Sequence, residues 1–158
     1  MKVIKAKTAG FCFGVKRAVD TVYKQVDTKC GQIYTYGPII HNEEVIKDMR
    51  DKGVIVLRSE EDLDMISQGT VIIRSHGVEK RIYEKIEQKG LRIVDATCPF
   101  VKKIHNIVSE KSGEGFHIII IGNPEHPEVV GIKGWAKDNV TVIQSAEDAE
   151  CFTADRKE

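Results

Sequence analysis

The 158-residue chain is long enough for one ordinary domain or two small ones with hydrophobic cores. Its composition, 41% hydrophobic and 30% charged, predicts a folded protein rather than a disordered one. The 24 basic and 24 acidic residues cancel, which argues against a nucleic-acid or membrane-surface role driven by bulk charge. A local anion-binding site is still compatible with this balance.

No apolar run approaches the length of a membrane span, and the first residues lack the apolar stretch and small-residue cleavage pattern of a signal peptide. We therefore expect a cytoplasmic protein with no membrane segment. In that compartment, the cysteines at positions 12, 30, 98 and 151 favour metal binding, catalysis or inert thiols over disulfides.

Short runs rich in Val and Ile alternate with segments whose apolar residues recur every three or four positions. The predicted strands are Ile33–Tyr36, Val54–Leu57, Val71–Arg74, Leu91–Val94, His117–Ile121 and Val140–Ile143. The predicted helices are Val15–Gln25, Glu43–Asp51, Lys80–Lys89, Val101–Glu110 and Val129–Trp135, and a further short helix fits Glu61–Ile66. This alternation predicts parallel sheets with helical crossovers, hence an α/β fold.

The pattern restarts after Cys98 with a helix, a strand and another helix. We therefore predict two small parallel-sheet α/β units, residues 1–97 and residues 98–158. The end, from Ala146 to Glu158, is highly charged and is predicted to contain no strand, so we expect the second unit to be incomplete.

Four potentially reactive side chains follow predicted strands and precede predicted helices: His41, His76, Cys98 and His126. Ligands of open parallel sheets bind outside the carboxyl ends of the strands, so we expect these four residues to share one edge. Asn42 suits a helix N-cap, and Pro99 and Pro127 suit first helical positions. Free N–H groups at helix starts bind anions, which predicts a phosphate or diphosphate ligand. A helix start also favours the thiolate form of cysteine that metals require.

Histidines and cysteines also have ordinary structural interpretations. A lone histidine is more often a capping or surface residue than a ligand, and we keep that interpretation for His105 and His117. Cys12 and Cys98 could be small buried hydrophobes. We interpret the remaining two cysteines, Cys30 and Cys151, as residues without a role in the site.

Four further residues near the site have equally simple explanations. Glu128 could be a first-turn acid that suits the helix dipole. Lys16 and Arg17 could form a solvated helix face, and Trp135 is predicted to serve packing rather than to contact a cofactor.

Five segments in order carry a family resemblance: Ala9-Gly10-Phe11-Cys12-Phe13-Gly14-Val15, Gly37-Pro38-Ile39-Ile40-His41-Asn42, Arg74-Ser75-His76-Gly77-Val78, Asp95-Ala96-Thr97-Cys98-Pro99 and His126-Pro127-Glu128-Val129. Together they resemble the 4-hydroxy-3-methylbut-2-enyl diphosphate reductases, the last enzymes of the non-mevalonate isoprenoid pathway. One such segment would be a weak signal, whereas five over nearly the whole chain are a strong one.

The resemblance implies reductive removal of an allylic hydroxyl from the substrate, giving isopentenyl diphosphate and dimethylallyl diphosphate. It implies a 4Fe-4S cluster held by three cysteines, with electrons from ferredoxin or flavodoxin. By matching segments, Cys12 and Cys98 would ligate the cluster. His41, His76 and His126 would line the diphosphate site. Glu128 would belong to the proton-delivery network as its acid.

The resemblance also implies a fold of three α/β units around the cluster, with the third cysteine in sequence beyond the second unit. This chain reaches Glu158 before that region, and Cys151 does not stand in the third-cysteine motif. We therefore expect an N-terminal portion of a longer enzyme, with little or no reductase activity of its own. The third cysteine should then follow Glu158.

Three alternatives stay open at this point. The chain could be a non-catalytic remnant that binds diphosphates without a stable cluster. Two chains could pair so that Cys12 and Cys98 of each bind one metal centre. A histidine-dependent phosphatase would explain the histidines but would leave both cysteines without a role.

Overall fold

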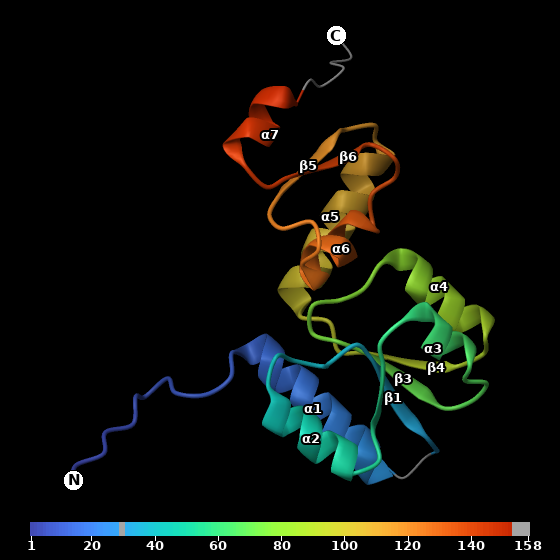
Figure 1. The fold of residues 1–158 in the computed structure, drawn as a ribbon. Helices are drawn as coiled ribbons and strands as arrows, with labels where there is room; N and C mark the ends of the chain where they lie inside the picture. The colour runs from blue at the N-terminus through green and yellow to red at the C-terminus, as the bar shows by residue number, and fades with distance from the viewer. Residues whose placement is uncertain (29–30, 153–158) are drawn as a thin grey trace.

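The computed structural model describes residues 1–28 and 31–152 of the chain. The first half contains α1 (Phe13–Thr28), β1 (Ile33–Tyr36), α2 (Glu43–Asp51), β2 (Ile55–Leu57), α3 (Glu60–Asp64), β3 (Thr70–Ile73), α4 (Lys80–Gln88) and β4 (Arg92–Asp95). The second half contains α5 (Pro99–Gly113), β5 (Ile118–Ile121), α6 (Pro127–Lys133), β6 (Val140–Ile143) and α7 (Ala146–Cys151). The two halves are stacked end to end (Figure 1).

The strands form two parallel sheets, which confirms the predicted fold class. The larger sheet has the order β2-β1-β3-β4, and the smaller one pairs β5 with β6. In the larger sheet Tyr36 is in register with Ile73, and Ile73 with Asp95. The carboxyl ends of β1, β3 and β4 therefore lie level at one edge, and the loops that carry His41, His76 and Cys98 leave from that edge.

Helices cover both faces of the larger sheet, with α1 and α2 on one side and α3 and α4 on the other (Figure 1). All four residues of β3 are buried, as expected for a central strand. Ile72 packs into the cluster under α1 and α2, whereas Val71 and Ile73 pack toward α4. Because alternate residues of β3 face opposite clusters, two cores hold this strand in register and fix the loop that follows it.

Predicted and observed elements differ mainly at their ends. Helix α5 begins at Pro99 and α6 at Pro127, two residues earlier than predicted, because proline occupies the first helical turn in both. Helix α7 was not predicted. Its signal is the capping box of Ser145 and Asp148, in which each side chain accepts a hydrogen bond from the other residue's backbone N–H.

The last strand of the larger sheet along the chain, β4, ends at Asp95, and the first helix of the second half, α5, begins at Pro99. The division of the chain into units 1–97 and 98–158 stays a prediction.

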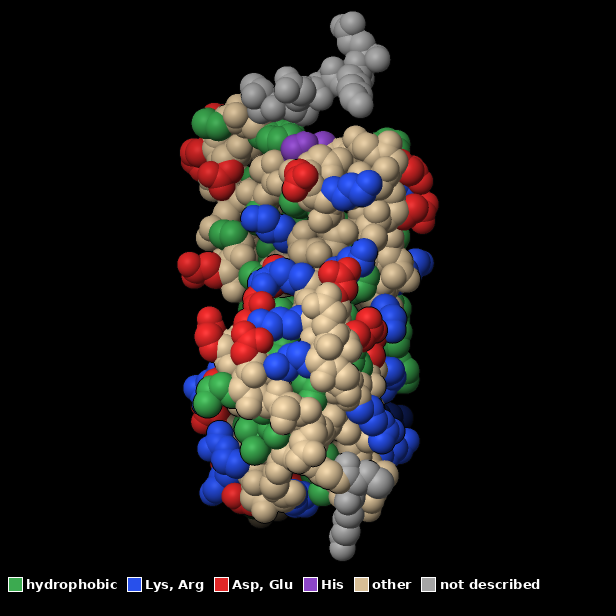
Figure 2. Space-filling model, turned by 90° about the vertical axis from the view of Figure 1, so that its right-hand side faces the viewer, with side chains coloured by type: hydrophobic (Ala, Val, Ile, Leu, Met, Phe, Trp, Pro, Cys, Tyr) green, Lys and Arg blue, Asp and Glu red, His purple; other side chains and the backbone are tan. Residues whose placement is uncertain are grey.

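Charges of both signs are interspersed on the face shown in Figure 2, in keeping with the balanced composition. Within residues 1–28 and 31–152, no helix is long and apolar enough to cross a membrane.

Candidate functional site

Three histidines from three loops lie together. The ring centroids of His41 and His76 are 4.8 Å apart, and those of His76 and His126 are 6.2 Å apart. His41 and His126 are exposed, whereas His76 is partly buried between them. The structure therefore brings the three predicted histidines into one cluster, which we call the histidine cluster. Its members come from both halves of the chain.

Hydrogen bonds between loops hold this arrangement. Ser75 donates from both its backbone N–H and its hydroxyl to the Ile39 carbonyl, at 3.3 and 3.0 Å. The Ser75 carbonyl in turn accepts from the backbone N–H of Cys98 at 2.9 Å. The buried Ser75 thus links the loop of His41, the loop of His76 and the loop of Cys98.

Two histidine-bearing loops lead directly into helix starts. Asn42, next to His41, caps α2 by accepting from the backbone N–H of Val45 at 3.1 Å. His126 itself caps α6, because its Nδ1 accepts from the backbone N–H of Glu128 at 3.2 Å. With Nδ1 used as an acceptor, the proton of a neutral His126 ring sits on Nε2, which is then free to donate to a ligand. Both loops therefore present hydrogen-bond donors beside the positive end of a helix.

The electrostatics of the cluster suit an anion. Burial, and after it the neighbouring His41, Arg74 and His126, together lower the pKa of His76 from 6.5 to about 4. Every neighbour that shifts this pKa is thus a potential cation. The ligand-free cluster disfavours a proton on His76, and a negatively charged ligand would reverse that preference.

Cys12 and Cys98 both stand immediately before a helix. Cys12 precedes α1, and its carbonyl accepts the helical hydrogen bond from Lys16 at 2.9 Å. Cys98 is the N-cap of α5, and its side chain makes no capping bond. Gly14 is buried against Cys98, since a Cβ built at Gly14 would lie 2.6 Å from the Cys98 Sγ. The start of α1 therefore packs directly on the second cysteine, and both thiols remain uncommitted.

Arg17 joins these two cysteine-bearing segments, so the interpretation of Arg17 as part of a solvated face is wrong. Its guanidinium donates to the carbonyls of Thr97 at 2.9 Å and Asp95 at 3.2 Å. Only Lys16 fits that interpretation, because it is exposed and pairs with Asp20. No local spacing in the sequence could reveal the role of Arg17, because its partners lie about 80 positions away.

Glu128 lies in the first turn of α6, partly buried, two residues after His126. Its carboxylate has no hydrogen bond or ion pair within the described part of the chain. Cys151 is exposed on α7, more than 50 positions after Cys98 in the sequence. Cys30 lies outside the described residues. His117 is exposed and bonds to Thr141.

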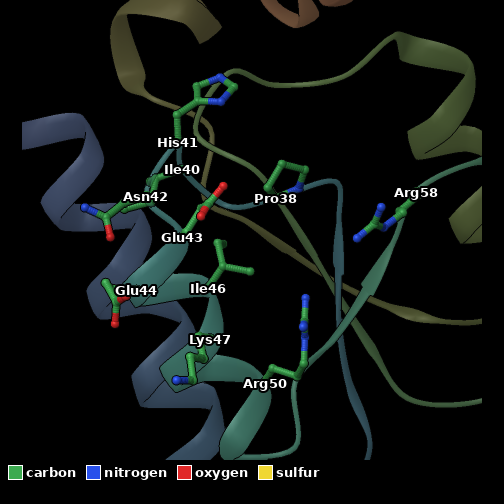
Figure 3. Close-up of a pocket in the computed structure, with 10 residues that line it drawn as sticks. All are labelled: Pro38, Ile40, His41, Asn42, Glu43, Glu44, Ile46, Lys47, Arg50 and Arg58. Carbon is green, nitrogen blue, oxygen red and sulfur yellow. The ribbon is translucent and has the colours of Figure 1, made fainter.

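A cavity of about 650 Å³ adjoins His41 and is lined by Pro38, Ile40, His41, Asn42, Glu43, Glu44, Ile46, Lys47, Arg50 and Arg58. In Figure 3, Arg50 of α2 and Arg58 after β2 extend toward each other, and His41 stands at the far end. Neither guanidinium has an ion pair or hydrogen bond with another described residue. The cavity beside His41 therefore carries three cations, Lys47, Arg50 and Arg58, against two acids, Glu43 and Glu44.

In the described ranges, no group of three or more His, Cys, Asp and Glu side chains has the arrangement of a metal site. The two cysteines nevertheless suit a thiolate-ligated metal group, since Gly14 lets the two cysteine-bearing segments approach and neither thiol forms a disulfide with another described residue.

The fold and the site together define a parallel α/β protein with a histidine cluster at helix starts and two cysteines at neighbouring helix starts. Residues 3–157 match the family model described as LytB protein, and the chain belongs to this family.

Several curated proteins are similar to this chain. It is 48% identical over 151 residues to the 4-hydroxy-3-methylbut-2-enyl diphosphate reductase of Caldanaerobacter subterraneus, covering 95% of this chain and 52% of that protein. The reductase of the same name from Clostridioides difficile is 45% identical, again over 95% of this chain and 53% of its own length. The chain thus spans about half the length of the curated relatives it matches.

Two solved structures of reductases are also similar to this chain. The E-1-hydroxy-2-methyl-but-2-enyl-4-diphosphate reductase of Plasmodium falciparum superposes with a TM-score of 0.87 at 32% identity, covering 94% of this chain and 46% of that one. A structure described as (E)-4-hydroxy-3-methyl-but-2-enyl diphosphate reductase, the terminal enzyme of the non-mevalonate pathway, gives 0.78 at 39% identity, over 92% and 52% of the two chains. The resemblance found in the sequence motifs is therefore confirmed at the level of the family.

Proposed function

We propose that this chain provides the diphosphate-binding part and two cluster ligands of a 4-hydroxy-3-methylbut-2-enyl diphosphate reductase. The observation that carries the proposal is the histidine cluster, with ring centroids 4.8 and 6.2 Å apart at the edge where helix starts converge. Family membership supplies the reaction: the substrate's allylic hydroxyl is removed with two electrons and two protons, giving isopentenyl and dimethylallyl diphosphates.

Each site residue has a role that its surroundings support. His41, His76 and His126 would hold the diphosphate through ring N–H donors, helped by the starts of α2 and α6. Glu128 would supply the proton with which the hydroxyl leaves as water, because its partly buried carboxyl group has no other partner among the described residues.

Cys12 and Cys98 would hold a 4Fe-4S cluster together with a third cysteine outside the described site. Such a cluster supplies electrons and an open iron that polarises the hydroxyl oxygen. Arg17 would keep the two cysteine-bearing segments together, through its bonds to the carbonyls of Asp95 and Thr97. We further propose ferredoxin or flavodoxin as the electron donor and the cytoplasm as the compartment.

Anaerobic reconstitution with iron and sulfide tests the proposal. Because the chain supplies two of the three cluster cysteines, we expect a brown protein with less iron and sulfide than one full cluster, and both contents should fall further in Cys12→Ser and in Cys98→Ser. The matched control Cys151→Ser, at an exposed position on α7, should keep both. A colourless protein that still binds inorganic pyrophosphate would support a diphosphate-binding module instead. A protein that binds neither would contradict both functions.

A further inference from the structure

The distance between His76 and His126 depends on how α6 is seated. His76 follows β3 in the first half of the chain, whereas His126 caps α6 in the second half. No hydrogen bond joins the two rings, which stand at 84° with their centroids 6.2 Å apart. Their spacing must therefore come from contacts elsewhere between α6 and the loop that follows β3.

Those contacts are concentrated on the residues directly after His76. The indole N–H of Trp135, which follows α6, donates to the Val78 carbonyl at 2.9 Å. The Gly134 carbonyl accepts from the backbone N–H of Lys80 at 3.4 Å. On α6 itself, a Cβ built at the buried Gly131 would lie 3.6 Å from the His76 carbonyl oxygen. The helix and its end thus rest on one short backbone segment.

Aromatic rings pack around Trp135, where the end of α6 meets the segment after His76. The ring of Trp135 lies on the ring of His105, with centroids 5.1 Å apart and an angle of 17°. His105, from α5, is 1% exposed, and its ring fills the space beside Gly77, where any Cβ would overlap with it. Tyr83 of α4 meets Trp135 edge-on at 5.7 Å. Three helices therefore converge on one indole.

Two further features connect the position of the Trp135 indole with the position of His126. The Nε2 atom of His105 has no hydrogen-bond partner in the described part of the chain, so the ring serves by its shape rather than by a polar contact. Helix α6 has seven residues and so spans about 10 Å between its two ends. A change in the seating of Trp135 at one end is thus carried to His126 at the other.

We propose that Trp135, backed by His105, is a positioning residue that sets the separation of His126 and His76 and thereby the affinity of the diphosphate site. This inference rests on the proposed function for its ligand, but the geometry that it assigns to Trp135 can be tested without one.

The test uses Trp135→Phe, which keeps an aromatic ring and removes only the indole donor, and Trp135→Ala, which removes both. Isothermal titration with inorganic pyrophosphate should show affinity about fivefold to tenfold weaker for Trp135→Phe, the equivalent of one lost hydrogen bond, and weaker still for Trp135→Ala. NMR titration of the ligand-free variants should show the His76 ring protonating at a higher pH than in the unmodified chain.

Ile86→Val is the matched control, because Ile86 is a buried residue of α4 that packs in the core of the first half, so the substitution loosens the fold away from α6. It should bind pyrophosphate like the unmodified chain. Unchanged affinity and unchanged His76 titration in Trp135→Phe would overturn the inference, as would an equal loss of affinity in Ile86→Val. If the unmodified chain binds no pyrophosphate, the proposed function fails, while the His76 titration still decides whether Trp135 positions α6.

Discussion

Diphosphate binding should convert His76 from a neutral to a protonated ring. In the ligand-free site burial and the three neighbours His41, Arg74 and His126 hold the pKa of His76 at about 4 instead of 6.5. That interval corresponds to about 3 kcal/mol against the charged ring, an upper bound because the ring is only partly buried. His76 is therefore neutral at pH 6 until an anion arrives.

A bound diphosphate reverses this balance. Two unit charges about 4 Å apart interact by about 4 kcal/mol at an effective dielectric constant of about 20. One negative charge at that distance already outweighs the cost of charging His76, and a diphosphate brings more than one. We therefore expect the bound ring to titrate above pH 6.5, with uptake of about one proton per complex near pH 6.

Isothermal titration of inorganic pyrophosphate in two buffers of different ionisation enthalpy measures this proton uptake directly. As pH falls from about 6 to 4.5, affinity in the unmodified chain should improve by up to about tenfold per pH unit beyond the trend of His76→Gln, because binding takes up a proton. The His76→Gln variant keeps a hydrogen-bond donor and removes the titration, so it also accounts for the protonation of pyrophosphate itself. Equal proton uptake in the two proteins would refute the reasoning.

Three further predictions concern stability and are checked by urea unfolding. Burial lowers the pKa of His105 from 6.5 to about 4, so as pH falls the unfolded chain takes up a proton on this ring before the folded chain does. Up to about 3 kcal/mol of stability should therefore be lost between pH 6.5 and 4. His105→Leu should flatten this dependence of stability on pH. Gly77→Ala should lower the free energy of unfolding by about 2–4 kcal/mol, because Gly77 has φ +71° and packs on the His105 ring. The control Gly53→Ala, at φ +87° in open space, should lower it by about 1 kcal/mol. Equal losses in the two variants would refute the packing argument. Arg17→Met should lower the free energy of unfolding by about 1–3 kcal/mol, because it removes two hydrogen bonds to backbone carbonyls. The control Lys16→Met, at an exposed position, should change it by less than about 0.5 kcal/mol. Equal losses in the two variants would contradict this prediction.

The part of the site that could be predicted from the sequence is the part fixed by position along strands and helices. His41 and His76 follow strands whose carboxyl ends are level in the sheet, so strand patterns alone place both at one edge. The placement of these two residues needs only local periodicity and the geometry of parallel sheets. His126 also follows a strand, but that strand, β5, pairs with β6 in the smaller sheet, so the prediction that His126 shares one sheet edge with the others is wrong.

The residues that hold the site together were not predicted, because their partners lie far away in the sequence. Arg17 reads locally as one of several charges on an amphipathic helix, yet its bonds cross to the loop of Cys98. Trp135 was correctly predicted to serve packing, but its neighbours His105 and Val78 come from two other segments. Periodicity shows which face of a helix is apolar and does not show what that face meets.

The most direct test of the central claim is an NMR titration of the chain with 4-hydroxy-3-methylbut-2-enyl diphosphate, following the histidine rings. The account predicts saturable shifts of His41, His76 and His126, with His117 as the unaffected internal control because it bonds to Thr141 on β6. Absence of saturation, or shifts that leave these three rings unchanged, would contradict the assignment of the histidine cluster as the diphosphate site.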